Sequence, residues 1–307
     1  MNQITYDIAV VGGGPAGMTA ALYAARGGKS VILFEGEAFG GQIVVSERIE
    51  NYPALPDTDG FTFAQNLKTQ IESQGVTVVQ AKVTGVEKQT ASFSVQADRI
   101  YTARSVILAT GLKHRKLGVP GEEELIGKGV SFCATCDGRF YRNREVAVIG
   151  GGNTAVQDAL VLSEYCSKVY LIHRRMELRA EEELVKRLGS RPNIEFIGDT
   201  VVEEMQGESR LEALSLKNRS TGAMQYLPVA GVFEAIGYIP QNEPFSNVAA
   251  LDEYGYFLSS PTGAASTEGV FVAGDACQKK IRQLTTAVSD GTVAALFAAE
   301  YLDRVSG

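Results

Sequence analysis

Hydrophobic residues in this chain come in short runs that are separated by glycine-rich turns and helical stretches. The run at 6–11, Y-D-I-A-V-V, is rich in β-branched residues, which is typical of a buried parallel strand. A glycine turn follows it, then a helical stretch to Ala25, then a second apolar run at 31–34 that ends at Glu35. This order of strand, glycine turn, helix, strand and acid predicts a complete βαβ unit.

The same pattern returns near the middle of the chain. Residues 145–149 predict a strand, 150–155 a second glycine turn, and 168–172 the next strand after a helix that ends near Ser163. The spacing repeats as well, because Glu35 lies 23 residues after Gly12 and His173 lies 23 residues after Gly150. The chain therefore contains two copies of one nucleotide-binding design.

Both copies continue in parallel beyond these units. Residues 82–101 and 201–227 alternate short β-rich segments with polar turns, as small antiparallel sheets do. An apolar run ending in glycine closes each copy, at 106–111 and at 232–237. We therefore predict an α/β fold with two Rossmann-like dinucleotide-binding domains, each with a small antiparallel β insertion.

The domain boundaries follow from the stretches that contain proline and glycine. Such stretches at 117–121 and 237–244 predict the two joints between the domains. The run at 269–275 predicts a further strand, which we expect to return to the first domain. The predicted domains are residues 1–113 with 245–307, and residues 114–244.

The first glycine turn has the spacing G-x-G-x-x-G. Gly12 permits the tight turn, Gly14 lets the backbone approach a pyrophosphate, and Gly17 lets the helix pack on the strand. The helix N-terminus supplies amide donors, and Glu35 is placed to accept hydrogen bonds from a ribose. The alternative is a glycine turn with no ligand, but the flanking strand, helix and acid favour dinucleotide binding.

The second glycine turn is G-x-G-x-x-A and lacks the acid. His173, Arg174 and Arg175 occupy that place, and Arg179 lies one helical turn beyond. Guanidinium groups bind a phosphate through paired hydrogen bonds, whereas a carboxylate would repel it. This half therefore predicts an NADPH site, with a solvated basic patch as the alternative.

A C-x-x-C pair, Cys133 and Cys136, stands between the two copies. Such a pair closes a disulfide readily, and its thiols are often activated. A structural zinc site needs four ligands, whereas Cys166, Cys277, His114 and His173 form no second pair, so no metal is expected. An inert structural disulfide remains the other alternative. Asp137 follows the pair and is placed to shuttle a proton, or else forms a turn with Gly138.

Composition narrows the function further. The 307 residues are 45% hydrophobic and 21% charged, with a formal net charge of −7, which disfavours nucleic acid and anionic membranes as partners. No apolar run approaches the ~20 residues of a membrane span, and the first residues do not resemble a signal peptide. Four cysteines do not make a disulfide scaffold, so we expect a cytoplasmic protein with a catalytic pair.

Together these motifs resemble the low-molecular-weight thioredoxin reductases of bacterial type, over nearly the whole chain and in the same order. The motifs that carry the resemblance are G-G-G-P-A-G at 12–17, G-G-Q at 40–42, A-T-G at 109–111, C-A-T-C-D-G at 133–138, G-G-G-N-T-A at 150–155, H-R-R-x-x-x-R at 173–179, and G-D at 274–275 with R-Q at 282–283.

The resemblance implies a homodimeric NADPH-dependent flavoprotein that binds FAD and reduces thioredoxin. Cys136 would face the flavin, Cys133 would attack the protein substrate, and Asp137 would be the acid/base. The FAD residues would be Gly12, Gly14, Pro15, Ala16, Gly17, Glu35, Gly41, Gln42, Asn51, Val83, Ala109, Thr110, Gly111, Gly274, Asp275, Arg282 and Gln283. The NADPH residues would be Gly150, Gly152, Asn153, Thr154, Ala155, His173, Arg174, Arg175, Arg179, Ile236 and Gly237.

Two positions depart from the pattern of that family. Met176 stands where many members carry an acid, and we expect little effect because the arginines are intact. Cys277 stands where an apolar residue is commoner, and a buried, inert thiol is expected there.

Three alternatives stay open at the level of function. The acceptor could be a glutaredoxin-like protein or a protein of a peroxiredoxin system, because a docking surface leaves no motif. The chain could also be a non-catalytic NADPH-binding redox sensor.

The resemblance further implies that the NADPH domain rotates against the FAD domain, with 112–120 and 237–244 as hinges.

Overall fold

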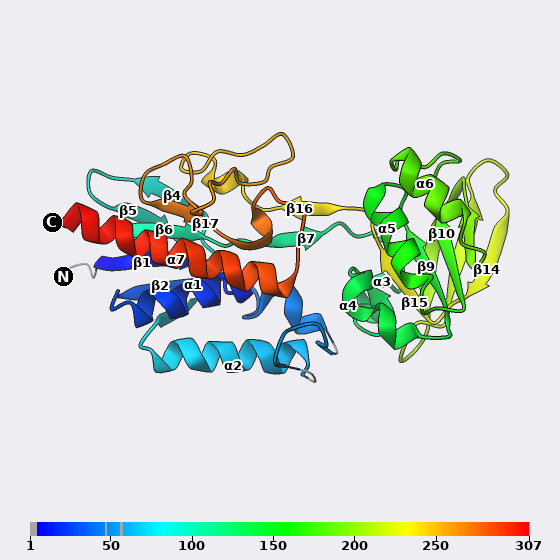
Figure 1. The fold of residues 1–307 in the computed structure, drawn as a ribbon, viewed down its shortest axis with the longest axis horizontal. Coiled ribbons are helices and arrows are strands. Elements are labelled where there is room, and N and C mark those ends of the chain that lie inside the picture. The colour runs from blue at the N-terminus through cyan, green and yellow to red at the C-terminus, as the bar shows by residue number, and fades with distance from the viewer. Residues whose placement is uncertain (1–4, 47, 56–57, 307) are drawn as a thin grey trace. The chain divides into compact units, whose positions relative to one another are not determined.

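The chain divides into two compact units. The computed structural model describes residues 5–46, 48–55 and 58–306. Unit 1 comprises Met1–Lys113 and Ile239–Gly307, and unit 2 comprises His114–Tyr238 (Figure 1). The second crossing thus falls after Tyr238, rather than after 244 as the sequence predicts. The reason is Asn242, which is fully buried and donates hydrogen bonds from Nδ2 to Gly255 O and Ala276 O of unit 1.

Unit 1 is built on a seven-stranded sheet in the order β3-β2-β1-β6-β5-β4, with β17 also paired to β6. Strands β1, β2, β3, β6 and β17 are parallel, and β4 and β5 add an antiparallel edge. The predicted insertion thus joins the main sheet instead of forming a separate one. The strands are β1 (Thr5–Val11), β2 (Val31–Glu35), β3 (Thr77–Gln80), β4 (Gly85–Lys88), β5 (Phe93–Gln96), β6 (Ile100–Leu108) and β17 (Val270–Val272).

Three long helices accompany this sheet: α1 (Pro15–Arg26), α2 (Gly60–Ser73) and α7 (Leu284–Ser306). Pro15 occupies the first turn of α1, where its missing N–H removes no helix hydrogen bond. Helices α1 and α7 lie side by side in Figure 1, and a Cβ on Gly291 would come 2.1 Å from Ala16 O. Two stretches from opposite ends of the chain therefore pack closely into one core.

Unit 2 is built on a five-stranded parallel sheet in the order β11-β10-β9-β15-β8. The antiparallel insertion is here a separate sheet in the order β12-β13-β14. The strands are β8 (Val130–Ser131), β9 (Glu145–Ile149), β10 (Lys168–Ile172), β11 (Ile194–Ile197), β12 (Thr200–Gln206), β13 (Ala213–Asn218), β14 (Met224–Pro228) and β15 (Gly231–Glu234). The helices are α3 (Glu122–Leu125), α4 (Ala134–Asp137), α5 (Asn153–Leu162) and α6 (Glu182–Gly189), and the short 3-10 turns of the chain are Gly41–Val45, Gly138–Tyr141, Glu243–Phe245 and Gly274–Ala276.

The strand registers confirm the internal repeat. Strand β1 pairs with β6 so that Val11 faces Leu108, and β9 pairs with β15 so that Ile149 faces Glu234. Both glycine turns therefore leave their sheet at the same place, directly after the first strand. The carboxyl ends of parallel strands meet at one edge of a sheet, where α/β proteins bind nucleotides.

The chain crosses between the units on two short strands, β7 (Leu112–His114) and β16 (Tyr238–Pro240), which pair with each other. Arg115 N also donates to Gly237 O at 3.0 Å. The second crossing lies within the predicted joint at 237–244, whereas the first lies before the predicted joint at 117–121, at the start of the predicted hinge 112–120. Rotation about these strands stays a prediction. None of the helices in the described ranges has the length and hydropathy of a membrane span.

Candidate functional site

The first glycine turn is shaped for close backbone approach. Gly12 has φ +109°, and a Cβ there would lie 2.2 Å from Ala109 O. A Cβ on Gly17 would lie 1.9 Å from Gly12 O, so only glycine fits at this position in the first turn of α1. A Cβ on Gly14, in contrast, would have no described atom within 4 Å. The open side of the turn is thus at Gly14, where the first amides of α1 are exposed to an anion.

Glu35 is locked against this turn. It ends β2, and its Oε2 accepts a hydrogen bond from Gly13 N at 2.7 Å while Oε1 accepts one from Glu37 N at 2.6 Å. A carboxylate has about four acceptor positions, so both oxygens keep capacity for ribose hydroxyls. The turn and the acid together fit the adenosine diphosphate part of a dinucleotide.

The other predicted FAD residues of unit 1 follow the strands that end at this same edge. Gly41 approaches the open side of the turn, since its Cβ would lie 3.5 Å from Gly14 Cα. Gln42 Nε2 donates to Leu112 O at 2.8 Å, and Asn51 Nδ2 donates to Gln283 Oε1 at 3.2 Å. Val83 is instead buried in the core beside the sheet. The remaining predicted FAD residues lie at the start of α1 (Pro15 and Ala16), after β6 (Ala109, Thr110 and Gly111) and after β17 (Gly274 and Asp275). The guanidinium group of Arg282 lies over the Tyr256 ring.

Two ionic residues that the sequence did not single out hold the turn after β17. Asp290 Oδ2 accepts hydrogen bonds from Gly274 N at 3.1 Å and from Lys279 Nζ at 2.6 Å. Lys279 Nζ also lies 3.4 Å from Asp275 Oδ1. Burial raises the pKa of Asp275, and the Lys279 ammonium opposes that shift. Asp275 is thereby held at the sheet edge.

Asn242, which contacts Thr110, is a third residue that the sequence did not single out. The Thr110 hydroxyl donates to Asn242 Oδ1 at 2.6 Å. Asn242 lies far along the sequence in a joint, where no pattern marks it. Only the return of the chain to unit 1 brings the two side chains together.

The second glycine turn repeats the first. Gly150 has φ +152°, and a Cβ there would lie 2.5 Å from Ala235 O, the counterpart of Ala109 O. A Cβ on Gly152 would again have no described atom within 4 Å. This turn is therefore open at the position that corresponds to Gly14. Ala155 is buried in α5, Thr154 is exposed, and Ile236 and Gly237 follow β15 at the same sheet edge.

His173 takes the place of Glu35 in this copy. A Cβ on Gly151 would lie 2.4 Å from the His173 ring, just as a Cβ on Gly13 would lie 2.8 Å from Glu35 Cβ. His173 is buried, and burial together with the charges of Arg179, Arg174 and Arg175 lowers its pKa. The imidazole is therefore neutral near pH 7 and leaves the positive charge to the arginines.

The three arginines lie in the loop after β10 and are exposed. Arg179 N donates to Gly151 O at 2.7 Å, which fixes the far end of the loop to the glycine turn. Arg174 O accepts a hydrogen bond from Arg219 Nη1 at 2.9 Å. The charges of all three arginines act on His173, which takes the position where a carboxylate would stand in an NADH site.

Asn153 has a structural part in this loop. Its amide exchanges two hydrogen bonds of 2.9 Å with Glu181, one with the backbone N–H and one with the carboxylate. Asn153 therefore clamps the start of α5 to the start of α6, and a contact with a nucleotide is a proposal beyond that role.

The C-x-x-C pair forms a disulfide between Cys133 and Cys136, with Cα atoms 5.3 Å apart. Cys133 is the N-cap of α4 and Cys136 lies within this single helical turn, where Asp137 N donates a hydrogen bond to Cys133 O at 3.1 Å. Both cysteines are half-buried. Ser131 Oγ accepts a hydrogen bond from Cys133 N at 3.1 Å and donates to Asp137 Oδ2 at 2.6 Å. The acid beside the disulfide is thus held in place by a serine that the sequence did not single out.

The other two cysteines are buried thiols. Burial raises the pKa of Cys166 to about 11 and that of Cys277 to about 12. Both are therefore protonated and unreactive near neutral pH, as expected for Cys277. The described residues contain no group of His, Cys, Asp and Glu that could hold a metal ion.

A buried pair of acids lies at the end of β15. Glu234 takes the position that Leu108 has in unit 1, and it is 4% exposed beside Glu122, which is 1% exposed. The oxygens of Glu122 accept hydrogen bonds from the N–H groups of three successive residues, Leu117, Gly118 and Val119, at 3.0, 2.6 and 3.2 Å. Burial and the charge of Glu122 raise the pKa of Glu234 to about 8. Glu234 therefore keeps its proton near neutral pH.

His114 lies where the first crossing strand enters unit 2. Its ring stacks on Phe132 with centroids 4.1 Å apart, and the Tyr238 ring lies 4.9 Å away. Burial, aided by the charge of Lys116, lowers the pKa of His114 to about 4. The residue before Cys133 is therefore packed against a neutral imidazole.

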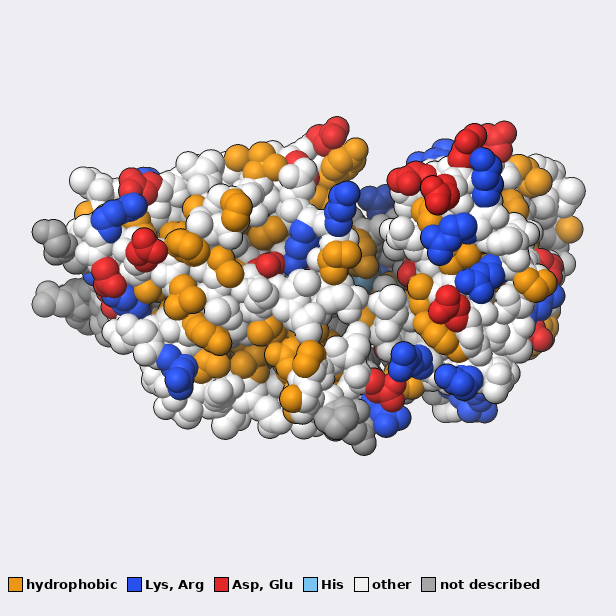
Figure 2. Space-filling view, viewed as in Figure 1, with side chains coloured by type: hydrophobic (Ala, Val, Ile, Leu, Met, Phe, Trp, Pro, Cys, Tyr) orange, Lys and Arg blue, Asp and Glu red, His pale blue; other side chains and the backbone are white. Residues whose placement is uncertain are grey.

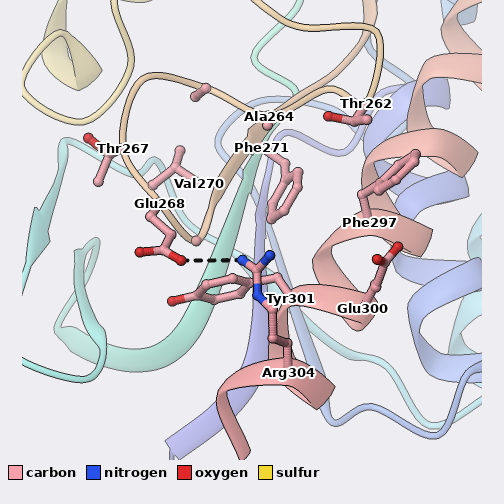
Figure 3. Close-up of a pocket in the computed structure, with 12 residues that line it drawn as sticks. Thr262, Ala264, Thr267, Glu268, Val270, Phe271, Phe297, Glu300, Tyr301 and Arg304 are labelled. Carbon is pink, nitrogen blue, oxygen red and sulfur yellow. Dashed lines mark hydrogen bonds and ion pairs between the residues drawn. The ribbon is translucent and has the colours of Figure 1, made fainter.

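A pocket in unit 1 lies away from all of these groups. It opens between the loop at 262–271 and α7 (Figure 3), and its ion pair joins Arg304 Nη2 to Glu268 Oε1 at 3.3 Å. Val270 begins β17, so the pocket lies at the amino end of the strands, opposite the glycine turn. It is not part of the dinucleotide site.

Known proteins resemble this chain over its whole length. The family described as pyridine nucleotide-disulphide oxidoreductase matches residues 6–291. The chain belongs to this family. Two relatives of this oxidoreductase are named thioredoxin reductase. The one from Treponema pallidum (strain Nichols) is 41% identical, and the match covers 99% of both chains. The one from Peptoclostridium acidaminophilum is 39% identical, and the match covers 97% of both chains.

Among solved structures, the oxidoreductase superposes on a thioredoxin reductase from Streptococcus pyogenes MGAS5005. The TM-score is 0.93 at 38% identity, and the match covers 98% of this chain and 99% of the other. The fold prediction is therefore confirmed, and so is the resemblance on which the site residues were chosen.

Proposed function

We propose that this protein is a thioredoxin reductase that binds FAD in unit 1 and NADPH in unit 2. The observation that carries the proposal is the Cys133–Cys136 disulfide, placed beside Asp137 in the same unit as the arginine-lined glycine turn. When bound, FAD would take two electrons as hydride from NADPH and make them available to the disulfide. The relatives named thioredoxin reductase support thioredoxin as the acceptor.

Unit 1 supplies what FAD binding requires. The open turn at Gly14 would give its amides to the pyrophosphate, and Glu35 would accept hydrogen bonds from the ribose. Asp275, with its raised pKa, lies at the same edge and would face the polar chain between the two halves of the cofactor. These residues bind and orient the cofactor.

Unit 2 supplies the NADPH site and its specificity. Gly152 leaves the second turn open for the pyrophosphate, and Arg174, Arg175 and Arg179 would bind the 2′-phosphate. Neutral His173 fills the space of the missing acid without repelling a phosphate. Thus the two copies differ in charge at one position, and this difference would direct NADPH to unit 2.

The disulfide chemistry would use three residues of unit 2. The Cys133 thiolate would attack the disulfide of thioredoxin, and Cys136 would then attack the mixed disulfide and release the reduced partner. Asp137 would supply a proton to the thiolate that leaves. Because the disulfide and the NADPH turn belong to one unit and the FAD residues to the other, we propose that the units turn relative to each other in each cycle.

The proposal is tested by NADPH oxidation with purified thioredoxin, glutaredoxin and a peroxiredoxin-system protein as separate acceptors. The FAD-loaded enzyme should turn over fastest with thioredoxin. Cys133→Ser and Cys136→Ser should abolish that turnover while NADPH still bleaches the flavin; Cys166→Ser is the matched control and should behave as the wild type. A protein that bleaches with NADPH but reduces none of the acceptors would be a redox sensor instead.

The proposal includes a homodimer in the cytoplasm, where NADPH is available. Figure 2 shows apolar side chains gathered over α1 and α7, and the exposed large hydrophobic residues of these two helices are Tyr23, Leu296, Phe297 and Val305, at 41%, 55%, 38% and 51%. Such a patch is larger than isolated surface apolar residues and favours an interface between copies. Sedimentation should give twice the mass of one chain.

A further inference from the structure

We propose that Ser131 is a positioning residue for the proton transfer at the disulfide. The inference rests on the proposed function, because it concerns the step in which Asp137 gives or takes a proton. Ser131 is 7% exposed and lies at the end of β8, two residues before Cys133. Its hydroxyl contacts both ends of the redox turn: Cys133 N at 3.1 Å and Asp137 Oδ2 at 2.6 Å.

The direction of these two hydrogen bonds is fixed. The Cys133 N–H can only donate, so Ser131 Oγ is the acceptor there. The hydroxyl has one proton, and it therefore goes to Asp137 Oδ2. A hydrogen bond donated to a carboxylate is among the stronger ones, so it sets which way the Asp137 carboxyl group faces.

Ser131 is paired into the parallel sheet of unit 2. Strand β8 pairs in parallel with β15, with Val130 opposite Val232 and Ser131 opposite Phe233. In contrast, α4 is a single turn of four residues. The Ser131 hydroxyl thus joins the redox turn, through Cys133 N and Asp137 Oδ2, to a residue of the sheet.

The proton balance shows where this matters. The reduced pair carries two electrons, which pass to the partner as its S–S bond breaks and the Cys133–Cys136 bond forms. Each partner sulfur leaves as a thiolate and must take up a proton. Asp137 supplies one of these protons, and the Ser131 hydroxyl keeps its own proton throughout. Its part is to hold the carboxyl group where the leaving sulfur can reach it.

The test compares Ser131→Thr, which keeps the hydroxyl, with Ser131→Val, which has the same shape without it. Both are β-branched residues suited to a strand, so both should fold. The rate at which dithiothreitol reduces the disulfide of the FAD-loaded enzyme is measured by alkylation and mass analysis. Ser131→Val should be slower by roughly tenfold, the loss of one hydrogen bond to a charged group, and Ser131→Thr within about twofold of the wild type.

The same measurement is then made on an Asp137→Asn background. There, Ser131→Val should cause no further loss, because its effect passes through the carboxylate. An equal loss on both backgrounds would overturn the inference, and so would equal rates for Ser131→Thr and Ser131→Val, or an unchanged rate for Asp137→Asn alone. Dithiothreitol needs neither NADPH nor thioredoxin, so failure of thioredoxin turnover in the wild type would refute the proposed function separately.

Discussion

The buried acids Glu122 and Glu234 predict a loss of stability as the pH rises. Glu234 holds a proton in the folded protein up to about pH 8, whereas its ordinary value is 4.5. Between these values the folded chain binds one proton more than the unfolded chain at this site. Stability therefore falls with rising pH, starting near pH 4.5 and levelling off above about pH 8.

The magnitude follows from the shift. One pH unit within this window lowers the free energy of unfolding by about 1.4 kcal/mol, and the whole window is worth about 5 kcal/mol. Glu234→Gln removes the titration but keeps the size of the side chain. The variant should therefore gain about 3 kcal/mol relative to the wild type between pH 6 and pH 8.

The assay is urea unfolding of the full chain, followed by circular dichroism at four pH values from 6 to 9. Other groups with raised pKa, such as Asp158, contribute equally to both proteins and cancel in the difference. Glu124→Gln, at an exposed neighbour of Glu122, is the matched control and should show no such trend. A difference between Glu234→Gln and wild type that stays constant across this range would refute the raised pKa of Glu234.

Further predictions concern the cofactor turns, the acid and the crossing. Replacing Arg174 and Arg175 with neutral residues should raise KM for NADPH by roughly tenfold or more and leave NADH use nearly unchanged; equal losses with both would show that they do not bind the phosphate. Gly14→Ala should fold normally yet release FAD more easily, because its Cβ would meet no described atom within 4 Å. Gly17→Ala should destabilise the fold, because its Cβ would collide with Gly12 O. Equal thermal melting temperatures for the two variants would contradict this difference. Asp137→Asn should slow thioredoxin reduction by roughly a hundredfold and spare flavin content; unchanged turnover would leave Asp137 only a turn former. A disulfide engineered between the units should stop turnover until it is reduced, and full turnover in the verified cross-linked enzyme would rule out the rotation.

The sequence predicts most of the fold, because its signals are local. Each βαβ unit lies within one short segment that contains the first strand, the glycine turn and the residue that ends the second strand. The two copies have the same spacing, so each supports the assignment of the other. The position of Glu35 against Gly13 and of His173 against Gly151 follows from that spacing alone. The antiparallel insertion of unit 1 is different, since its pairing with β6 depends on tertiary contacts that no local pattern marks.

The parts of the site that the sequence did not reveal are those joined only by folding. Ser131 looks like an ordinary strand residue until its hydroxyl meets Asp137. Asp290 lies on a long helix, far in sequence from the turn whose amide it accepts. Glu234 interrupts an otherwise apolar strand, and this is the one signal that could have been noticed. Its partner, Glu122, lies more than a hundred residues earlier.

The discontinuity of unit 1 has a consequence for how the protein is made. Strand β17 and helix α7 complete the core around β6 and α1, yet they are synthesised after unit 2. Unit 2 is one uninterrupted segment, His114–Tyr238, so all of its strands have been synthesised before β17 and α7. We therefore expect unit 2 to fold on the ribosome before Met1–Lys113 can pack with the second segment of unit 1. The nascent chain would gain its NADPH-binding unit first, and its flavin-binding unit only after helix α7 has been synthesised.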